Sequence, residues 1–305
     1  LFYLYKELND ARKHIYQDFL FMKVIAESGS TTTEWVLVDG KNVLERSFTE
    51  GINPFFQTRR EISHSIRLNL PETFFKKRWE RVYFYGAGCA NLDKKNILEA
   101  SLVAQFKTPI SAESDLLAAA RGLLIDKPGI ACILGTGSNS CLYDGERIIK
   151  NVRSAGYILG DEGSGTALGK RLIGDWLKGL LDEELSGKLA ESYGWDEADI
   201  IRKVYREPEA NRFLASFTPF LKAHRTHPAV HRILTDCFKA FFERNIMAYR
   251  PGPLAVHFVG SIAAIFREEL EETAGIYGIR IGNILREPIG RMVAYHQQKL
   301  KNETD

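Results

Sequence analysis

The sequence has few cysteines, and they follow no metal-binding or disulfide pattern. The four cysteines, Cys89, Cys132, Cys141 and Cys237, are widely scattered along 305 residues. No spacing is typical of a zinc site, and two of the four lie in apolar strand patterns, where a small buried thiol is the simplest interpretation. Such cysteine usage is typical of a reducing compartment, so we expect a cytoplasmic protein.

A strong net charge and long apolar runs are also missing. The formal net charge is +2 at pH 7, which argues against binding to nucleic acid or a membrane surface through bulk electrostatics. The longest uncharged stretch, residues 251–266, is too short and too broken by glycine and proline to cross a bilayer. We therefore expect neither nucleic acid nor a membrane among the partners.

Residues 1–21 fit neither a signal peptide nor a membrane span. Their apolar start is followed at once by charged residues, and no small-residue cleavage site appears. Met22 stands directly before the first strand pattern. We expect residues 1–21 to form an N-terminal extension outside the core, with an amphipathic helix packed on the domain as the alternative.

Two familiar phosphate-binding fingerprints are absent. Residues 164–171 resemble a Walker loop, but the motif neither begins with glycine nor ends with serine or threonine, and no strand adjoins it. Residues 86–91 follow a strand but lack the third glycine of a dinucleotide fingerprint. Gly86 is therefore a candidate for lining a substrate pocket instead.

Two short loops rich in glycine and hydroxyl residues are present. Residues 27–33 read ESGSTTT and residues 135–140 read GTGSNS, and each loop interrupts two strand-like runs. A hairpin tip of this kind offers backbone N–H groups to phosphate oxygens with no bulky side chain in the way. An ordinary solvent-facing turn explains either loop alone, but two such tips suggest two walls of one nucleotide cleft.

The two halves of the chain repeat one order of elements. In the first half we expect strands at 23–27, 34–38, 42–48 and 82–85, an extended piece at 108–110, and helices at 57–69, 93–106 and from 114. In the second half we expect strands at 130–134, 140–143, 147–151, 254–259 and 279–282, and helices at 164–249, 261–274 and 287–300. This order predicts two mixed sheets with helices on both faces, and the helices at 164–249 look like an insertion.

Five motifs carry a resemblance to a known family. They are AESGST at 26–31, GINP at 51–54, ESD at 113–115, LGTGSN at 134–139 and GYILGDEGS at 156–164. The chain resembles, over about residues 22–300, the N-acetylglucosamine kinase family, which is grouped with the BadF/BadG-type ATPases in the superfamily of sugar kinases, heat-shock ATPases and actin.

The resemblance implies an α/β fold of two ribonuclease-H-like, or actin-like ATPase, domains with a nucleotide cleft between them. The expected domains are residues 22–112 and 113–305, the second with the helical insertion. The last helix is expected to pack back on the first domain.

Phosphoryl transfer needs phosphates held in line with an acceptor, charge compensation and a base. ATP with Mg²⁺ is the implied phosphate donor. The expected ATP and phosphate contacts are Ser28, Gly29, Ser30, Thr31 and Thr32 in the first tip, Gly135, Thr136, Gly137 and Ser138 in the second, and Gly260 and Ser261 on the adenosine side.

Asp115 is the candidate base, because it matches the position of the family's catalytic aspartate, just upstream of the second tip. Its alternative role is to stabilise the start of the following helix. Asn53, Asn139 and Asp161 match positions that hold sugar hydroxyls in the family. A turn residue for Asn53 and a helix cap at 161–164 are the alternatives. Glu27 and Asp161 are the nearest acidic candidates for Mg²⁺.

The sequence departs from the family pattern at two positions. Thr32 stands where related kinases commonly carry lysine or arginine, and Glu27 stands where many carry aspartate. The leading interpretation is an ATP-dependent kinase, with homodimerisation as a further expectation, that phosphorylates a hydroxyl of an N-acetylated hexosamine such as N-acetylglucosamine. A BadF/BadG-type ATPase activator and a non-catalytic sugar sensor remain as alternatives.

Overall fold

The computed structural model describes residues 22–29, 31–40, 42–76, 79–89 and 91–304, with side chains described as far as residue 298. The expected extension 1–21 and Ser30 lie outside the described residues. The chain forms two compact units, one from the described parts of Leu1–Ile125 and Pro288–Asp305 and the other from Asp126–Glu287. The division between these units falls at residues 125 and 126, whereas the sequence predicts a domain boundary at residues 112 and 113. The predicted domains stay a prediction.

The first unit is a five-stranded sheet in the order β3-β2-β1-β4-β5. Its strands are β1 (Met22–Ser28), β2 (Thr32–Asp39), β3 (Asn42–Glu50), β4 (Arg81–Gly86) and β5 (Ile110–Ser114). Strands β1 to β3 form an antiparallel meander, whereas β1, β4 and β5 run parallel. The helical elements of this unit are α2 (Arg59–Asn69), η1 (Glu72–Phe75), α3 (Leu92–Phe106), α4 (Asp115–Leu124) and α14 (Ile289–Thr304).

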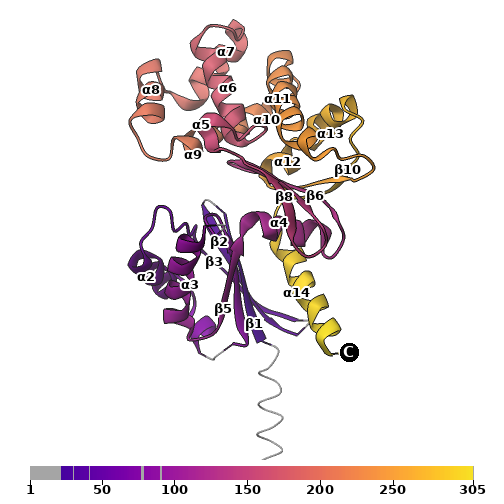
Figure 1. Ribbon diagram of the computed structural model, residues 1–305. Helices are drawn as coiled ribbons and strands as arrows, with labels where there is room; N and C mark the ends of the chain where they lie inside the picture. The colour runs from indigo at the N-terminus through magenta and orange to yellow at the C-terminus, as the bar shows by residue number, and fades with distance from the viewer. Residues whose placement is uncertain (1–21, 30, 41, 77–78, 90, 305) are drawn as a thin grey trace, which may run out of the picture. The chain divides into compact units, whose positions relative to one another are not determined.

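Helices cover both faces of this sheet, and successive side chains of β1 are buried on alternate faces. Val24 and Ala26 are buried in the core beneath α2 and α3, while Ile25 between them is buried in the core beneath α4 and α14. In Figure 1, α2 and α3 lie on one side of the sheet, and α4 and α14 lie on the other. Helix α14 thus packs within the first unit, although it comes last in the chain.

The second unit repeats the sheet with the order β10-β9-β6-β7-β8. Its strands are β6 (Gly129–Leu134), β7 (Ser138–Tyr143), β8 (Ile148–Val152), β9 (Val256–Val259) and β10 (Ile281–Leu285). As in the first unit, the meander is antiparallel and the later strands run parallel. The order of the strands and their directions match the ribonuclease-H-like arrangement that the sequence predicts, and the predicted α/β fold of the actin-like ATPases is confirmed.

Helices between β8 and β9 form most of the second unit's core. They are α5 (Gly156–Leu159), α6 (Gly165–Leu177), α7 (Glu183–Tyr193), α8 (Glu197–Tyr205), α9 (Ala210–Ala215), α10 (Thr218–Ala223), α11 (Pro228–Phe241), η2 (Phe242–Ile246) and η3 (Met247–Tyr249). Their apolar side chains pack with the sheet residues Ile130 and Cys132 into one cluster. The segment η2 is a π-helical turn that continues α11.

Two predicted elements differ from the structure. The single helix expected at 261–274 is wrong, because α12 (Ser261–Ile265) ends and α13 (Arg267–Ile276) begins on either side of Phe266. Phe266 is fully buried and its backbone is not helical, with φ −107° and ψ 38°. The extended piece expected at 108–110 continues as strand β5 to Ser114.

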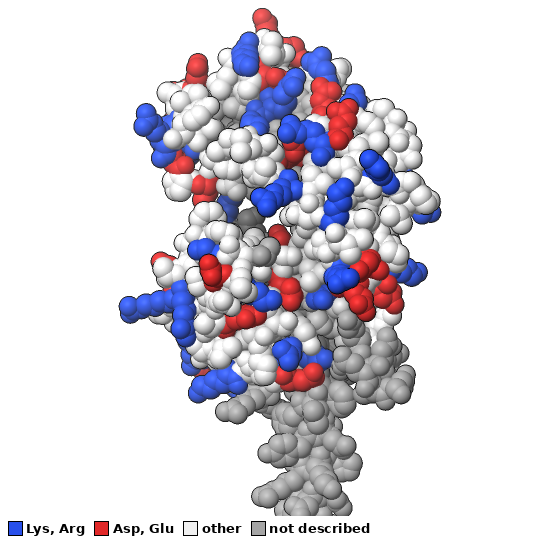
Figure 2. Space-filling view, in the orientation of Figure 1, with Lys and Arg blue, Asp and Glu red and all other residues white. Residues whose placement is uncertain are grey.

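The surface agrees with the small net charge. Lys and Arg side chains are mixed with Asp and Glu side chains on the face that Figure 2 shows. Within the described part of the chain, no helix combines the length and the apolar character that crossing a membrane requires.

Candidate functional site

The first hairpin tip, between β1 and β2, is tied to the chain that follows β3. The Gly29 N–H donates to the Thr32 carbonyl at 3.0 Å, and the Gly51 N–H donates to the Thr31 carbonyl at 2.9 Å. The buried Ser28 hydroxyl accepts from the Ile52 N–H at 2.8 Å and contacts the Thr33 hydroxyl at 2.8 Å. The Ser28 hydroxyl is therefore occupied inside the unit, whereas Gly29, Thr31 and Thr32 are exposed at the tip.

The ends of three strands bring several predicted residues together in the first unit. Gly86, at the end of β4, is the register partner of Ser28 on β1 and of Ser114 on β5. A Cβ atom at Gly86 would come within 3.2 Å of the Ser28 Cβ, so the strands approach closely there. Asp115 follows Ser114 at this carboxyl edge, which is the edge where open α/β sheets bind ligands.

Asp115 begins helix α4 but is not its cap. The Ser114 hydroxyl accepts from the Leu117 N–H at 3.2 Å and fills that role, while the Asp115 carboxylate accepts from the Leu116 N–H at 2.8 Å. Burial raises the pKa of Asp115 above its usual range, against the opposing effect of that N–H group. A half-buried carboxylate with a raised pKa is a better proton acceptor than an ordinary surface aspartate.

Cys89 lies beside this carboxylate. Burial, and secondarily the charge of Asp115, raise the pKa of the Cys89 thiol to about 12. The thiol is therefore neutral at physiological pH, and it is an inert neighbour of Asp115.

Asn53 has the turn geometry that its sequence position before Pro54 suggests. Its side-chain oxygen accepts from the Phe55 N–H at 3.0 Å, and its backbone N–H donates to the Gln57 side chain at 2.8 Å. The turn explains why asparagine stands here, and a contact from Asn53 to sugar stays a prediction.

The second hairpin tip, between β6 and β7, is attached to the start of α6. The Gly135 N–H donates to the Gly137 carbonyl at 2.9 Å and closes the tip. The Gly165 N–H donates to the Gly135 carbonyl at 2.9 Å, and the Thr166 N–H donates to the Thr136 carbonyl at 3.1 Å. Ser164 caps α6 by accepting from the Ala167 N–H at 3.2 Å.

Gly260 brings a third turn against the same tip. Its φ of +125° is a conformation that other residues rarely adopt. A Cβ atom at Gly260 would stand 2.6 Å from the carbonyl carbon of Leu134 and overlap the carbonyl oxygen. Only glycine allows the β9–α12 turn to touch the end of β6, and exposed Ser261 follows directly.

These turns line one cavity of about 400 Å³ in the second unit. Its walls include the predicted residues Gly135, Thr136 and Ser261, together with Gly165. Ala215, Thr218, Pro219, Ile262 and Ile265 add further, mainly apolar surface. A pocket with apolar walls and a few polar groups at one end suits a nucleotide, whose base is flat and whose phosphates are charged.

Lys222 and Arg286 also line this cavity, and sequence reasoning missed both. Both side chains are exposed, and neither has a carboxylate within ion-pair distance among the described residues. Two cations without acidic partners beside a glycine-rich turn favour an anionic ligand. No local motif marks them, because they reach the cavity from α10 and from the residue after β10.

The carboxylate of Asp161 also contacts the second tip, at Gly137 and Ser138. Its carboxylate accepts from the Ser138 N–H at 3.1 Å, and a Cβ atom at Gly137 would meet a carboxylate oxygen at 3.1 Å. Burial raises the pKa of Asp161, and the Ser138 N–H opposes that shift. The Ser138 N–H, expected to face phosphate, is thus already bonded to Asp161.

The loop that carries Asp161 is strained and anchored. Asp161 has φ +57°, and its N–H donates to the Ser154 carbonyl at 3.0 Å. Asn139 lies near the same tip, where its side-chain oxygen accepts from the Ser140 N–H and from the Asn151 amide, each at 2.9 Å. The left-handed conformation is one that aspartate adopts more readily than most other residues.

The metal site predicted for Glu27 and Asp161 has no preformed cage. Among the residues that the structure describes, no three His, Cys, Asp or Glu side chains are grouped to hold a metal ion. Mg²⁺ bound with ATP takes most of its ligands from phosphate and water, so one carboxylate near the phosphates is enough. The carboxylate of Asp161 lies against the Gly137 turn, and its role as a ligand of Mg²⁺ stays a prediction.

Comparisons with known proteins give structural matches only. Neither protein-family models nor curated protein sequences match the chain. Among solved structures, the chain is similar to a "putative N-acetylglucosamine kinase" of Porphyromonas gingivalis, with 43% identity and a TM-score of 0.88. The match covers 92% of this chain and 100% of the other.

The chain belongs to the N-acetylglucosamine kinase family, within the sugar kinase–actin ATPase superfamily. A second such "putative" kinase, from Chromobacterium violaceum, has 18% identity and a TM-score of 0.71 over 90% of this chain and 98% of its own. The ethanolamine utilization protein EutJ of Carboxydothermus hydrogenoformans has 14% identity and a TM-score of 0.56, over 90% of this chain and 89% of its own. The Chromobacterium and Carboxydothermus proteins share the fold of this chain. The 43% identical Porphyromonas protein confirms the family resemblance that was predicted from the sequence.

Proposed function

We propose that the chain is an ATP-dependent sugar kinase that phosphorylates a hydroxyl of an N-acetylated hexosamine, with N-acetylglucosamine as the first candidate. The observation that carries the proposal is the cavity on which Gly135, Gly165 and Ser261 converge beside Lys222 and Arg286. The name of the 43% identical relative supports the choice of sugar.

The cavity is the proposed nucleotide site. The apolar walls from α9, α10 and α12 suit the base and ribose, and the turn that begins with Gly135 and Thr136 is proposed to hold the phosphate end of ATP. Lys222 and Arg286 supply positive charge to the nucleotide. Mg²⁺, when bound, neutralises phosphate charge, and Asp161 and Glu27 are the side chains proposed to hold it, directly or through water. Gly29, Thr31 and Thr32 are proposed to add phosphate contacts from the first tip, as is Ser30, outside the described residues.

Asp115 is the proposed base. As the acceptor oxygen forms a bond to the terminal phosphorus, the bond between that phosphorus and ADP breaks, and the hydroxyl proton passes to the Asp115 carboxylate. Its raised pKa suits it to receive this proton. Asn53, Gly86, Asn139 and Asp161 are proposed to hold the sugar, because amide and carboxylate groups match its hydroxyl groups.

A coupled ADP-release assay over a panel of sugars tests the proposal. We expect turnover that depends on added sugar and is highest with N-acetylglucosamine. Sugar binding by calorimetry without ADP release would favour the sensor, whereas ADP release that no sugar stimulates would favour the ATPase activator. The buried positions of Cys89, Cys132 and Cys141 argue against an activator that shares an iron–sulfur cluster between subunits.

A further inference from the structure

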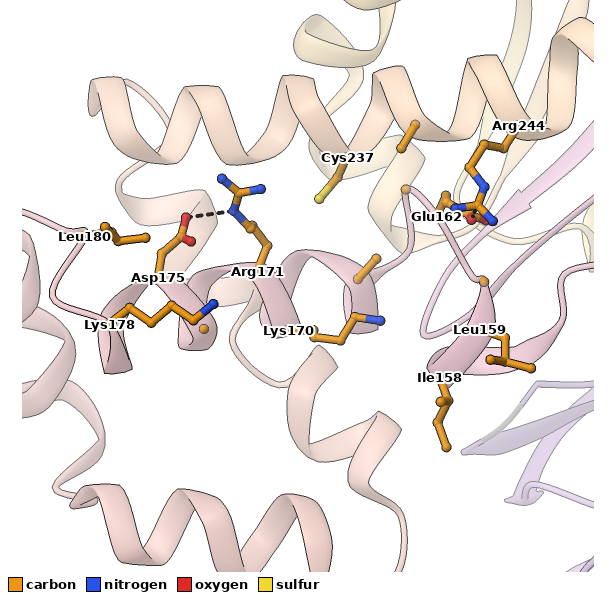
Figure 3. A pocket seen from close by; sticks show the side chains of 15 residues that line it. Ile158, Leu159, Glu162, Lys170, Arg171, Asp175, Lys178, Leu180, Cys237 and Arg244 are labelled. Atoms are coloured by element: carbon orange, nitrogen blue, oxygen red, sulfur yellow. Dashed lines mark hydrogen bonds and ion pairs between the residues drawn. The ribbon is translucent and has the colours of Figure 1, made fainter.

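A second cavity in the Asp126–Glu287 unit has no role in the proposed transfer. It measures about 620 Å³, and its walls come from α5, α6, α11 and the loop at 160–163 (Figure 3). It includes none of the residues predicted to bind sugar or nucleotide. Its volume is within the range of small-molecule sites.

The cavity carries an excess of positive charge. Its six charged side chains are Lys170, Arg171, Lys178, Arg244, Glu162 and Asp175. Both carboxylates are already paired, Asp175 with Arg171 at 2.8 Å and Glu162 with Arg244 at 2.8 Å. Lys170 and Lys178 remain, and neither has a carboxylate within ion-pair distance in the described part of the chain. Among the lining side chains the surplus is two positive charges, and Lys170 also acts electrostatically on Asp161, which does not line the cavity.

Lys170 lies on α6 and Lys178 directly follows its last residue, with Gly174 between them. Residues 170, 174 and 178 are spaced by four and so lie in one row along the helix. Figure 3 shows Lys170 and Lys178 on the same side of α6. The middle residue, Gly174, has no side chain, and a Cβ atom there would meet nothing within 4 Å. The rise between the two lysines is about 12 Å at 1.5 Å per residue. In Figure 3 the Lys178 side chain extends toward Lys170, whereas Lys170 extends away from Lys178, and the Lys170 ammonium donates to the Tyr157 carbonyl. A ligand that contacts both ammonium groups therefore requires the Lys170 side chain to turn toward Gly174.

We propose that this cavity binds a small molecule bearing a phosphomonoester group. A phosphomonoester carries about two negative charges at neutral pH, which match the two ammonium groups. Lys170 already donates to the Tyr157 carbonyl at 3.0 Å and keeps further N–H groups for a ligand. Ile158 and Leu159, 72% and 75% exposed at the rim, offer apolar contact to the rest of the molecule.

The loop that carries Asp161 forms part of the cavity wall, through Gly160, Glu162 and Gly163. Glu162 is held by Arg244 and by the Asn245 amide at 3.4 Å, and Gly163 packs against Phe241. Glu162 and Arg244 line the cavity, so a ligand that fills it contacts the loop next to Asp161. The cavity is therefore suited to an effector, and its existence does not depend on the proposed transfer reaction.

Calorimetric titration of the full chain tests the proposal, with inorganic phosphate and N-acetylglucosamine 6-phosphate as probes in separate arms. We expect Lys178→Met to weaken binding at least tenfold, since a charge-assisted hydrogen bond is lost. Lys188→Met, on α7, is the matched control and should bind like the wild type. Gly174→Leu keeps every charge but fills the gap, and should also weaken binding.

The arms identify the source of the phosphate group. Tighter binding of the sugar phosphate assigns the cavity to a phosphorylated sugar, and equal binding assigns it to free phosphate. N-acetylglucosamine itself should bind Lys178→Met as it binds the wild type, which separates this cavity from the proposed acceptor site. Absence of binding at millimolar concentrations, or unchanged binding by Lys178→Met, would overturn the proposal whether or not the chain is a kinase.

Discussion

Replacement of Gly260 by alanine tests the turn that completes the proposed nucleotide cavity. The backbone at Gly260 has φ +125°, a conformation that costs a non-glycine residue roughly 1–3 kcal/mol. The added Cβ atom would also overlap the carbonyl group of Leu134, and overpacking of this kind costs about 1–3 kcal/mol more. We expect Gly260→Ala to lower the free energy of unfolding by roughly 2–6 kcal/mol, a large share of the usual total.

Urea denaturation followed by circular dichroism measures this change, and calorimetry with a non-hydrolysable ATP analogue measures nucleotide binding. Gly187→Ala is the control, because Gly187 lies in the middle of α7 and a Cβ atom there meets nothing within 4 Å. We expect that control to raise stability by up to about 1 kcal/mol and to leave binding unchanged. Equal stability and equal nucleotide affinity of Gly260→Ala and the wild type would refute the reasoning.

Three further predictions concern the charges around the second tip. Lys222→Met or Arg286→Met should raise the KM for ATP about tenfold or more with little change in kcat, and unchanged kinetics would remove both residues from the nucleotide site. Burial raises the pKa of Asp161 in the folded protein above the unfolded value of 3.8. Between these two pKa values the folded protein binds more protons than the unfolded chain, so the contribution of Asp161 to stability falls as pH rises through this range. Asp161→Asn should therefore be more stable than the wild type in urea at pH 7 while losing kinase activity, and a less stable variant would contradict the pKa argument. Chelation of Mg²⁺ with EDTA should abolish ADP release and added Mg²⁺ should restore it, whereas full activity in EDTA would exclude the metal.

Most strands were predicted correctly, because the alternation of apolar and polar residues and the residues typical of turns can be recognised in the sequence. Asp39-Gly40 and Asp144-Gly145 marked the two hairpins that join the meander strands, and the structure has both. Strand β5 was only partly foreseen, because its last residues, Glu113 and Ser114, are polar. Their strand conformation comes from parallel pairing with β4, which is a tertiary contact that local sequence does not encode.

The sequence predicted the parts of the candidate site that lie in glycine-containing turns, and of these Gly260 has a backbone conformation that requires glycine. Gly135 and Gly260 stand out in the sequence, and the structure brings both turns against the end of β6. Lys222 and Arg286 belong to no motif, because distant parts of the chain bring them to the cavity. Ser28 was expected among the phosphate contacts of the first tip, and the structure shows that its hydroxyl joins the tip to Ile52, a contact that local sequence does not reveal.

The central claim is that this chain transfers a phosphoryl group to a sugar with Asp115 as the base. The most direct measurement is N-acetylglucosamine-dependent ADP release by the wild type and by Asp115→Asn, which keeps the size of the side chain and removes the base. We predict a fall in kcat of about a hundred- to ten-thousandfold with the fold intact by circular dichroism. Equal turnover by the two proteins, or no sugar-dependent turnover by the wild type, would contradict the claim.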